Sequence, residues 1–328
     1  MPRRKTTQDD PFTFSQRAVE VLKQSAWTFG AVDSNQVYEL RLRLATPSVF
    51  TPAKAEIPVP SLPTLDGFLS FLAFRAALAD ALEANPEFAN ELLWQWNAAL
   101  QNSKLWIEFA LPLKRVNFGA TQIYDCSIGL PIVEGEVSVP AGAFFVQGLD
   151  LEPYPRISDS IPLRRRVTQP SHPILNPIRN LDTQSGPTKL LDNRMYYALT
   201  EEFVFRFRGD AGGVRRLLDF AIQQRIGIGK KTTLGYGRIH EFHIDLVSGI
   251  SPTWTRSIPG GDNFSLVKTL PYDAVIARRE HAERDFFGCE RFRLLNALET
   301  LGACYPPYWL KERQTQVLNY GTVLLPGK

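Results

Sequence analysis

The stretch that decides the fold is EEFVFRFRGDAGGVRRLLDFAIQQRIGIGKKTTLGYGRIHEFHIDLV, residues 201–247. Phenylalanine occupies every second position from 203 to 207, and this alternation predicts a strand. Asp210 is placed to cap a helix over residues 211–224, in which the apolar residues form one stripe. After a glycine-rich loop, alternation over residues 236–247 predicts another strand. The order here is therefore strand, helix, glycine loop and strand.

A second unit of this kind precedes that stretch. Residues 37–44, VYELRLRL, alternate between apolar and charged side chains, which is typical of a half-buried strand. Residues 65–82 carry apolar side chains at helical spacing, with Thr64 or Asp66 available as the cap. Residues 104–111, KLWIEFAL, alternate again and predict the next strand. Two such halves predict an α+β protein with a ferredoxin-like, RRM-like sandwich, a fold that hosts many unrelated functions.

The rest of the chain is arranged around a domain expected at residues 37–247. Residues 1–36 are expected to form an N-terminal extension. Residues from about 112 to 193 are rich in Pro, Ser, Gly and Asn, which predicts a long, loop-rich insertion within the domain. Residues 248–328 are expected to form a C-terminal extension with one helix at about 287–301.

Composition restricts the classes of protein that fit this chain. Its 328 residues carry a formal net charge of +3, so a surface for nucleic acid must come from local clusters of cations. Three cysteines without CxxC spacing argue against a disulfide framework and against a zinc site. No apolar run fits a signal peptide or a membrane span. We therefore expect a soluble, cytoplasmic protein with no membrane partner, metal or cofactor.

The glycine-rich loop has the composition of a site for a phosphate backbone. Glycine permits positive φ and a close approach to a ligand, and successive free amides in such a turn form a nest for anions. Lysine, arginine and threonine add charges and hydroxyl donors. The alternative is a tight turn between helix and strand with solvated lysines. The candidate contact residues are Gly227, Gly229, Lys230, Lys231, Thr232, Thr233, Gly235, Tyr236, Gly237 and Arg238.

A nucleotide-binding P-loop must be considered for the same residues. That motif requires GxxxxGK followed by Ser or Thr, whereas Lys231 follows Gly229 and Lys230, and Gln224 stands where the first glycine belongs. A P-loop also connects a strand to the following helix, which is the reverse of the order here. Nucleotide hydrolysis is therefore not expected.

The spacing of the glycines resembles the RAMP superfamily of CRISPR-associated proteins. The hallmark of that superfamily is Gly-x-Gly, a basic spacer and a second Gly-x-Gly, between the last helix and the last strand of a ferredoxin-like domain. Further motifs narrow the resemblance to the type IV Cas-five subunit. These motifs are Leu65-Asp66-Gly67, Phe207-Arg208-Gly209-Asp210, the string IGKKTTLGYGR and Pro306-Pro307-Tyr308-Trp309.

The resemblance covers residues 37–247 and the short match near the end of the chain. It implies a non-catalytic subunit that holds the 5′ handle of the guide RNA (crRNA) and caps one end of the backbone filament of a CRISPR effector. The implied partners are crRNA, a Cas-seven-type backbone protein and a large or small subunit. Target DNA would be contacted indirectly, near the short DNA motif (PAM) beside the target.

Cations outside the glycine loop are further candidates for RNA contact. Arg164, Arg165 and Arg166 lie in a proline-rich stretch suited to phosphate and 2′-hydroxyl contacts, with a solvated basic turn as the alternative. Lys189 and Arg194 resemble basic positions that face RNA in members of the family.

Two other functions are open at this point. The first is a RAMP-type, metal-independent endoribonuclease that processes precursor crRNA, since such enzymes commonly use a histidine as general acid or base. His172 lies near the three arginines and is the candidate; alternation places His240 on the apolar face of its strand and His243 on the other face. The second is a protein-interaction module in which the glycine loop packs against a partner.

Overall fold

The computed structural model describes residues 20–22, 25–50, 61–84, 86, 108–132, 143–147, 191–195, 198–230, 232, 235–248, 252–258, 261–281, 287, 289–306, 308 and 311–327. For residues 143–147, 191–195, 198–199 and 311, only the backbone is described. These residues form an α+β protein in which the pairings between strands are mostly antiparallel. Within them, no helix combines the length and the apolar character needed to span a membrane.

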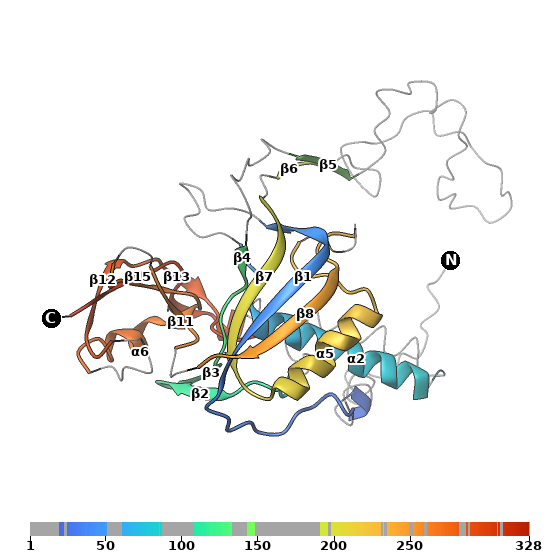
Figure 1. Ribbon diagram of the computed structural model, residues 1–328, viewed down its shortest axis with the longest axis horizontal. Helices are drawn as coiled ribbons and strands as arrows, with labels where there is room; N and C mark the ends of the chain where they lie inside the picture. The colour runs from blue at the N-terminus through green and yellow to red at the C-terminus, as the bar shows by residue number, and fades with distance from the viewer. Residues whose placement is uncertain are drawn as a thin grey trace, which may run out of the picture. The chain divides into compact units, whose positions relative to one another are not determined.

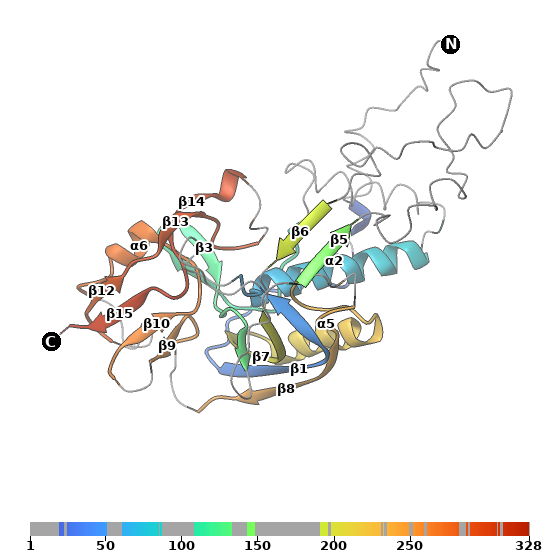
Figure 2. The ribbon, with the colours of Figure 1, turned by 90° about the horizontal axis from the view of Figure 1, so that it is seen from above.

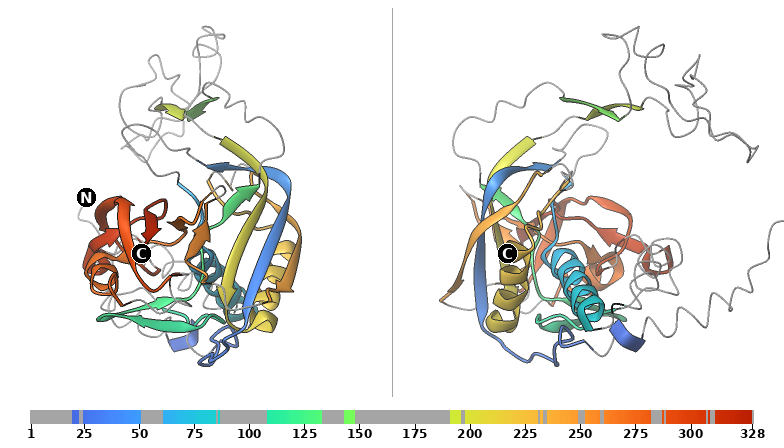
Figure 3. Two further views of the ribbon diagram at one scale, coloured as in Figure 1. Left: turned by 60° about the vertical axis from the view of Figure 1, so that its left-hand side comes forward. Right: turned by 90° about the vertical axis from the view of Figure 1, so that its right-hand side faces the viewer.

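Four strands and two helices form the main sheet and the layer that covers it. They are β1 (Val37–Phe50), α2 (Leu65–Ala84), β4 (Leu130–Ile132), β7 (Ala198–Arg208), α5 (Ala211–Gln223) and β8 (Ile239–Leu246). The strand order in the sheet is β4-β7-β1-β8, and β1 pairs antiparallel with β8 as β4 does with β7. Figures 1 and 3 show both helices on the same face of the sheet.

Alternation along the strands gives the sheet one buried face and one exposed face. In β1, Leu40 is fully buried in the core under the helices, whereas Arg41 lies on the other face and is exposed. In β7, Phe203, Phe205 and Phe207 are each fully buried in the same core. Burying a side chain of this size stabilises a fold by about 1.5–3 kcal/mol. Both strands predicted from this alternation are confirmed.

Helix α5 begins where its cap was predicted. The Asp210 carboxylate accepts a hydrogen bond from the amide of Gly212 at 2.9 Å, which satisfies one of the free donors of the first turn. Just before it, Arg208 forms a buried ion pair with Asp125 at 2.9 Å. Arg208 and Asp210 of the Arg-Gly-Asp sequence at 208–210 therefore both stabilise the fold.

Another strand than the one predicted at 104–111 joins the main sheet after α2. Residues 104–107 lie outside the described residues, residues 108–111 are not in a strand, and β4 is the strand that joins the sheet. Phe109 and Leu111 are nevertheless buried in the core. The alternation therefore reflects burial of an irregular segment, because apolar side chains at every second position need no neighbouring strand in order to pack.

A bulge in the β1–β8 pair changes the position of one histidine. The register shifts between Arg43, which is opposite Glu241, and Leu44, which is opposite Ile239, so His240 is the extra residue. His240 is exposed, and its predicted place on the apolar face is wrong. A bulge of one residue reverses the alternation, and the sequence does not mark where it occurs.

The C-terminal region forms two small sheets with a core of their own. Their strand orders are β12-β15-β10-β9 and β11-β14-β13. The core contains Trp254 and Phe287, and Phe118 and Ile123 reach it from a hairpin earlier in the chain. Figure 2 shows the second strand of that hairpin, labelled β3, beside the C-terminal strands. The elements are β2 (Arg115–Phe118) and β3 (Thr121–Tyr124) of that hairpin, then β9 (Thr255–Ser257), β10 (Phe264–Leu266), β11 (Leu270–Pro271), α6 (Tyr272–Ile276), β12 (Phe292–Asn296), β13 (Glu299–Gly302), the 3₁₀ turn η5 (Lys311–Arg313), β14 (Thr315–Leu318) and β15 (Val323–Pro326).

The helix predicted at about 287–301 is wrong, because β12 and β13 occupy most of that range. Phe292 is buried, whereas its neighbours Arg293 and Leu295 are exposed. An apolar run of this length fits either a helix or strands, and here pairing with β15 and β14 decides for strands.

The chain divides into two compact units. The larger one combines Met1–Val137 with Leu199–Lys328, and the smaller one is Ser138–Ala198. Within the smaller unit, β5 (Ala143–Gln147) pairs antiparallel with β6 (Leu191–Met195).

The expected extensions and insertion differ from this division. Residues 112–132, expected to be part of the loop-rich insertion, belong to the larger unit and supply β2, β3 and β4. In the expected N-terminal extension, Leu22 and Trp27 are buried in the main core. These segments therefore belong to the larger unit, in which apolar side chains from both of them are buried.

A buried ion pair joins helix α2 to the C-terminal region. Asp66 is fully buried and lies 2.9 Å from Nζ of Lys268, and the Tyr308 hydroxyl donates to it at 2.6 Å. Burial lowers the pKa of Lys268, but the attraction of Asp66 and Cys126 together with their hydrogen bonds outweighs this effect, and the pKa is raised. Removing one partner from such a pair leaves a buried charge uncompensated, which costs about 3–5 kcal/mol.

Three weakly acidic groups near this ion pair, two cysteine thiols and a tyrosine hydroxyl, keep their protons in the folded chain. Burial raises the pKa of Cys126 to about 12, and it raises the pKa of Cys304 to about 12 as well. Burial also raises the pKa of the Tyr308 hydroxyl well above its usual range. The folded chain therefore keeps these protons at pH values where the unfolded chain has lost them.

We predict that the free energy of unfolding decreases as the pH rises above about 9, the usual pKa of a cysteine. Between that pH and about 12 the unfolded chain binds fewer protons than the folded chain, so each raised group costs about 1 kcal/mol of stability per pH unit. Cys304→Ala removes one such group, and its stability should decrease less steeply than that of the wild type. Urea titrations from pH 8 to pH 11 measure both curves, and parallel curves would contradict the prediction.

Candidate functional site

The glycine loop is fixed to the end of β1 by hydrogen bonds. The Thr46 hydroxyl donates to the carbonyl of Gly235 at 2.7 Å, and the Ser48 hydroxyl donates to the carbonyl of Ile228 at 2.8 Å. The amide of Ala45 donates to the carbonyl of Arg238 at 2.7 Å. Two side chains and the backbone of one strand therefore hold both halves of the loop.

The loop's own amides are largely used in the same attachment. The amides of Lys230 and Gly237 donate to the carbonyls of Val49 and Pro47 at 3.1 and 3.0 Å. The amides of Ile228, Gly235 and Arg238 also have partners within the chain, namely the Gly237 and Thr232 carbonyls and the Thr46 hydroxyl. The expected nest of free amides is therefore wrong for these five groups, which leaves the side chains and the remaining amides for binding.

Glycine is required here for backbone geometry. Gly229, Gly235 and Gly237 have φ of 96°, 92° and 67°, in the region that other residues rarely adopt. A Cβ on Gly237 would also collide with the carbonyl oxygen of Ile228. The glycines thus let the loop fold back on itself and on β1.

The cations of the loop have no carboxylate near them in the sequence. Residues 225–238 contain Arg225, Lys230, Lys231 and Arg238 and no aspartate or glutamate. Arg225 and Arg238 are exposed, and neither guanidinium has a hydrogen-bond or ion-pair partner among the described residues. Lys230 is half-buried, and burial lowers its pKa. The loop is therefore a fixed segment whose positive charge is not offset by any carboxylate of its own.

The structure brings eight of the predicted contact residues together in this loop. Gly229 and Arg238 are exposed, Gly237 is buried, and the others are half-buried. Six other predicted contact residues lie outside the described residues, namely Lys231, Thr233, Arg164, Arg165, Arg166 and Lys189. Arg194 lies on β6, in the smaller unit, where only the backbone is described. The eight residues are Gly227, Gly229, Lys230, Thr232, Gly235, Tyr236, Gly237 and Arg238.

Sequence reasoning missed the residues that hold the loop. Thr46 and Ser48 lie beyond the alternating part of β1, about 180 positions before the loop that they bind. A threonine and a serine beside Pro47 indicate a turn, and only the β1–β8 pairing shows that they face the loop. Arg225 was also missed, although its place directly before the glycines was a usable signal.

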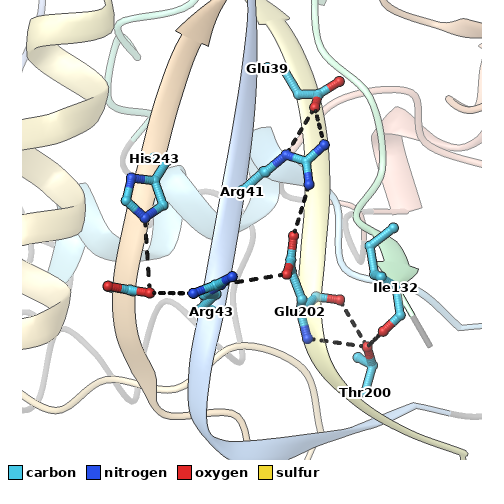
Figure 4. A network of polar contacts seen from close by, with 8 residues as sticks. Glu39, Arg41, Arg43, Ile132, Thr200, Glu202 and His243 are labelled. Carbon is cyan, nitrogen blue, oxygen red and sulfur yellow. Dashed lines mark hydrogen bonds and ion pairs between the residues drawn. The ribbon is translucent and has the colours of Figure 1, made fainter. Parts of the chain in front are cut away.

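The exposed face of the sheet is charged but balanced (Figure 4). Glu202 of β7 lies 3.5 Å from Arg41 and 3.8 Å from Arg43, both on β1. Glu241 of β8 lies 3.0 Å from Arg43 and 3.9 Å from His243. Exposed pairs of this kind contribute about 0–1 kcal/mol each. Because carboxylates already accompany these cations, this face attracts phosphate less than the glycine loop does.

The buried ionisable cluster of the described residues is not an accessible catalytic centre. The Asp66, Lys268 and Cys126 cluster is at most 3% exposed and its thiol has a pKa of about 12, so it offers no accessible nucleophile at neutral pH. Among the described ranges, no group of three His, Cys, Asp or Glu side chains is arranged to hold a metal. His172, the candidate of the endoribonuclease hypothesis, lies outside the described residues.

No protein-family model matches the chain, and a search of curated proteins also gives no match. The functional inference therefore depends on the geometry and charge of the loop.

We predict that Gly237→Ala destabilises the fold by at least about 2 kcal/mol, because the new Cβ meets the Ile228 carbonyl at positive φ. Gly30→Ala is the matched control, since a Cβ at Gly30 meets nothing within 4 Å, and it should change stability by less than about 0.5 kcal/mol. Urea unfolding monitored by circular dichroism measures both. Equal stability of the two variants would show that the loop is not fixed as described.

Proposed function

We propose that the chain is a non-catalytic, crRNA-binding subunit of a CRISPR effector ribonucleoprotein. The observation that carries the proposal is a loop held to β1 by hydrogen bonds from its described residues, with four cations and no carboxylate in the sequence from 225 to 238. A strand of phosphates is the ligand that a fixed loop rich in cations and free of carboxylates favours. In this proposal the loop grips the 5′ handle of the guide RNA.

The connectivity of the main sheet supports the proposal. The order β1, α2, β4, β7, α5, β8 along the chain, with β4-β7-β1-β8 across the sheet, is consistent with a ferredoxin-like split βαβ arrangement. The glycine loop then lies between the second helix and the last strand, as the RAMP pattern requires. Fold alone does not give function, so the charge of the loop remains the deciding argument.

The short motifs that suggested the type IV Cas-five resemblance interact in the structure. Asp66 of Leu65-Asp66-Gly67 accepts the hydrogen bond of Tyr308, which belongs to the Pro306-Pro307-Tyr308-Trp309 motif. A Cβ on Gly67 would collide with the Thr64 hydroxyl at 2.5 Å and would also lie 3.2 Å from the Tyr308 ring. The contact between Asp66 and Tyr308 supports a resemblance that covers both residues 37–247 and the short match near the end of the chain.

The remaining parts of the proposal follow from the resemblance. Such a subunit caps the filament of Cas-seven-type proteins in the cytoplasm, contacts a large or small subunit, and reaches target DNA indirectly near its PAM. The charge-balanced sheet face has the character of a polar protein contact, since paired charges favour specificity more than affinity.

We predict that Lys230→Ala/Arg238→Ala weakens binding of single-stranded repeat RNA and reduces its dependence on salt. The slope of log affinity against log salt should decrease by about 0.7 for each phosphate that the protein no longer neutralises, or about 1.4 for two phosphates. Fluorescence anisotropy with the full chain and a labelled RNA copy of the host's CRISPR repeat, at four salt concentrations, measures the slope.

The matched control is Arg279→Ala/Arg293→Ala, which removes the same charge from exposed positions in the C-terminal region. The control should retain the wild-type slope, and an equal decrease in both variants would contradict a specific role of the loop.

The RNA recovered from the same incubations tests the endoribonuclease alternative. Cleavage that is abolished by His172→Ala would overturn the non-catalytic assignment.

A further inference from the structure

A pocket lies between the start of helix α2 and the glycine loop. Its volume is about 420 Å³, within the range of sites that hold small organic molecules. Helix α2 contributes Phe68 and Phe71, and the segment before it contributes Ser61 and Thr64. Gly227 to Lys230 and Thr232 form the opposite wall. We call this the α2–loop pocket.

The α2–loop pocket is lined by both apolar and polar residues. Phe68 and Ile228 are buried and Phe71 is half-buried, so part of the Phe71 ring is accessible from the pocket. Lys230 is the one charged residue among the described residues that line it. The desolvation that lowers the pKa of Lys230 is consistent with a charge beside apolar surface.

We propose that the α2–loop pocket receives one unpaired nucleotide of the bound RNA, with its base against the Phe71 ring and its phosphate at Lys230. Every base has a flat π-face, and stacking on an aromatic side chain is the common way to hold an unstacked base. The proposal rests on the proposed function, because it assumes that a phosphate backbone follows the loop.

Two features favour a nucleotide over an apolar side chain of a partner protein. Ser61, Thr64 and Thr232 line the pocket beside the apolar residues, and hydroxyl groups suit the edge of a base or a ribose. Lys230 also lines the pocket, and the adjacent loop carries further cations and no carboxylate. A purely apolar side chain would gain nothing from this positive charge.

The experiment uses the full chain and nine-nucleotide oligouridylates that each carry one 2-aminopurine. Stacking quenches 2-aminopurine fluorescence, so one position in the series should be quenched far more than the others on binding. Phe71→Leu keeps most of the packing volume but removes the aromatic face. It should abolish that quenching and weaken binding by about 5- to 150-fold.

Further variants separate stacking from charge and from loss of fold. Phe71→Leu should leave the salt slope unchanged, because no charge is removed, whereas Phe71→Trp should retain the quenching. Phe264→Ala, on β10 in the C-terminal region, is the control for loss of a partly buried phenylalanine and should bind as the wild type does.

The outcomes distinguish this inference from the proposed function. If Lys230→Ala/Arg238→Ala weakens binding while Phe71→Leu changes neither affinity nor quenching, the pocket proposal fails and the RNA-binding proposal stands. If neither variant changes binding, both proposals fail. Wild-type quenching spread evenly over all positions would also overturn the pocket proposal.

Discussion

The attachment of the glycine loop to the end of β1 is the constraint on which the proposed site depends. β1 pairs with β8 and then continues past that pairing, so that residues 45–49 meet the loop that enters β8. Because β8 begins directly after the loop, both ends of the attachment are fixed by the same sheet. Cations on a fixed loop lose less conformational freedom on binding than cations on a mobile one. The sheet therefore prepares the loop for its ligand.

The same attachment determines which atoms are left for binding. Five amides of the loop, including those of Gly235 and Gly237, are used inside the chain, so these two glycines allow the backbone to fold and do not offer free donors to an anion. Arg225 and Arg238 stay exposed because nothing acidic follows the helix within the loop. The loop therefore resembles a rigid support with charged side chains more than an anion-binding nest. Affinity through such side chains is sensitive to salt and insensitive to the order of bases.

Much of the main sheet could be predicted from the sequence because its strands alternate strictly and its helices are amphipathic or apolar with a cap. Prediction failed where the local pattern does not determine the structure. Phe109 and Leu111 alternate like a strand but are buried in the core without lying in one, and β4, a strand of three residues, was too short to stand out. In the C-terminal region, most of residues 287–301 form β12 and β13, which pair with β15 and β14. The local sequence does not show this pairing with later strands. For the site, residue type and spacing located the loop, but its partners Thr46 and Ser48 follow only from the register of β1.

The C-terminal region also has a part in the site, although none of its residues lines the α2–loop pocket among those described. The Tyr320 hydroxyl accepts a hydrogen bond from the amide of Leu62. Tyr308 and Lys268 both bind the Asp66 carboxylate at the first turn of α2. Leu62 and Gly67 are pocket residues, so these contacts fix the wall opposite the loop. One wall of the pocket is thus set by β1 and the other by the C-terminal region. The buried ion pair between Asp66 and Lys268, 202 positions apart in the chain, therefore helps to position the α2 wall of the pocket.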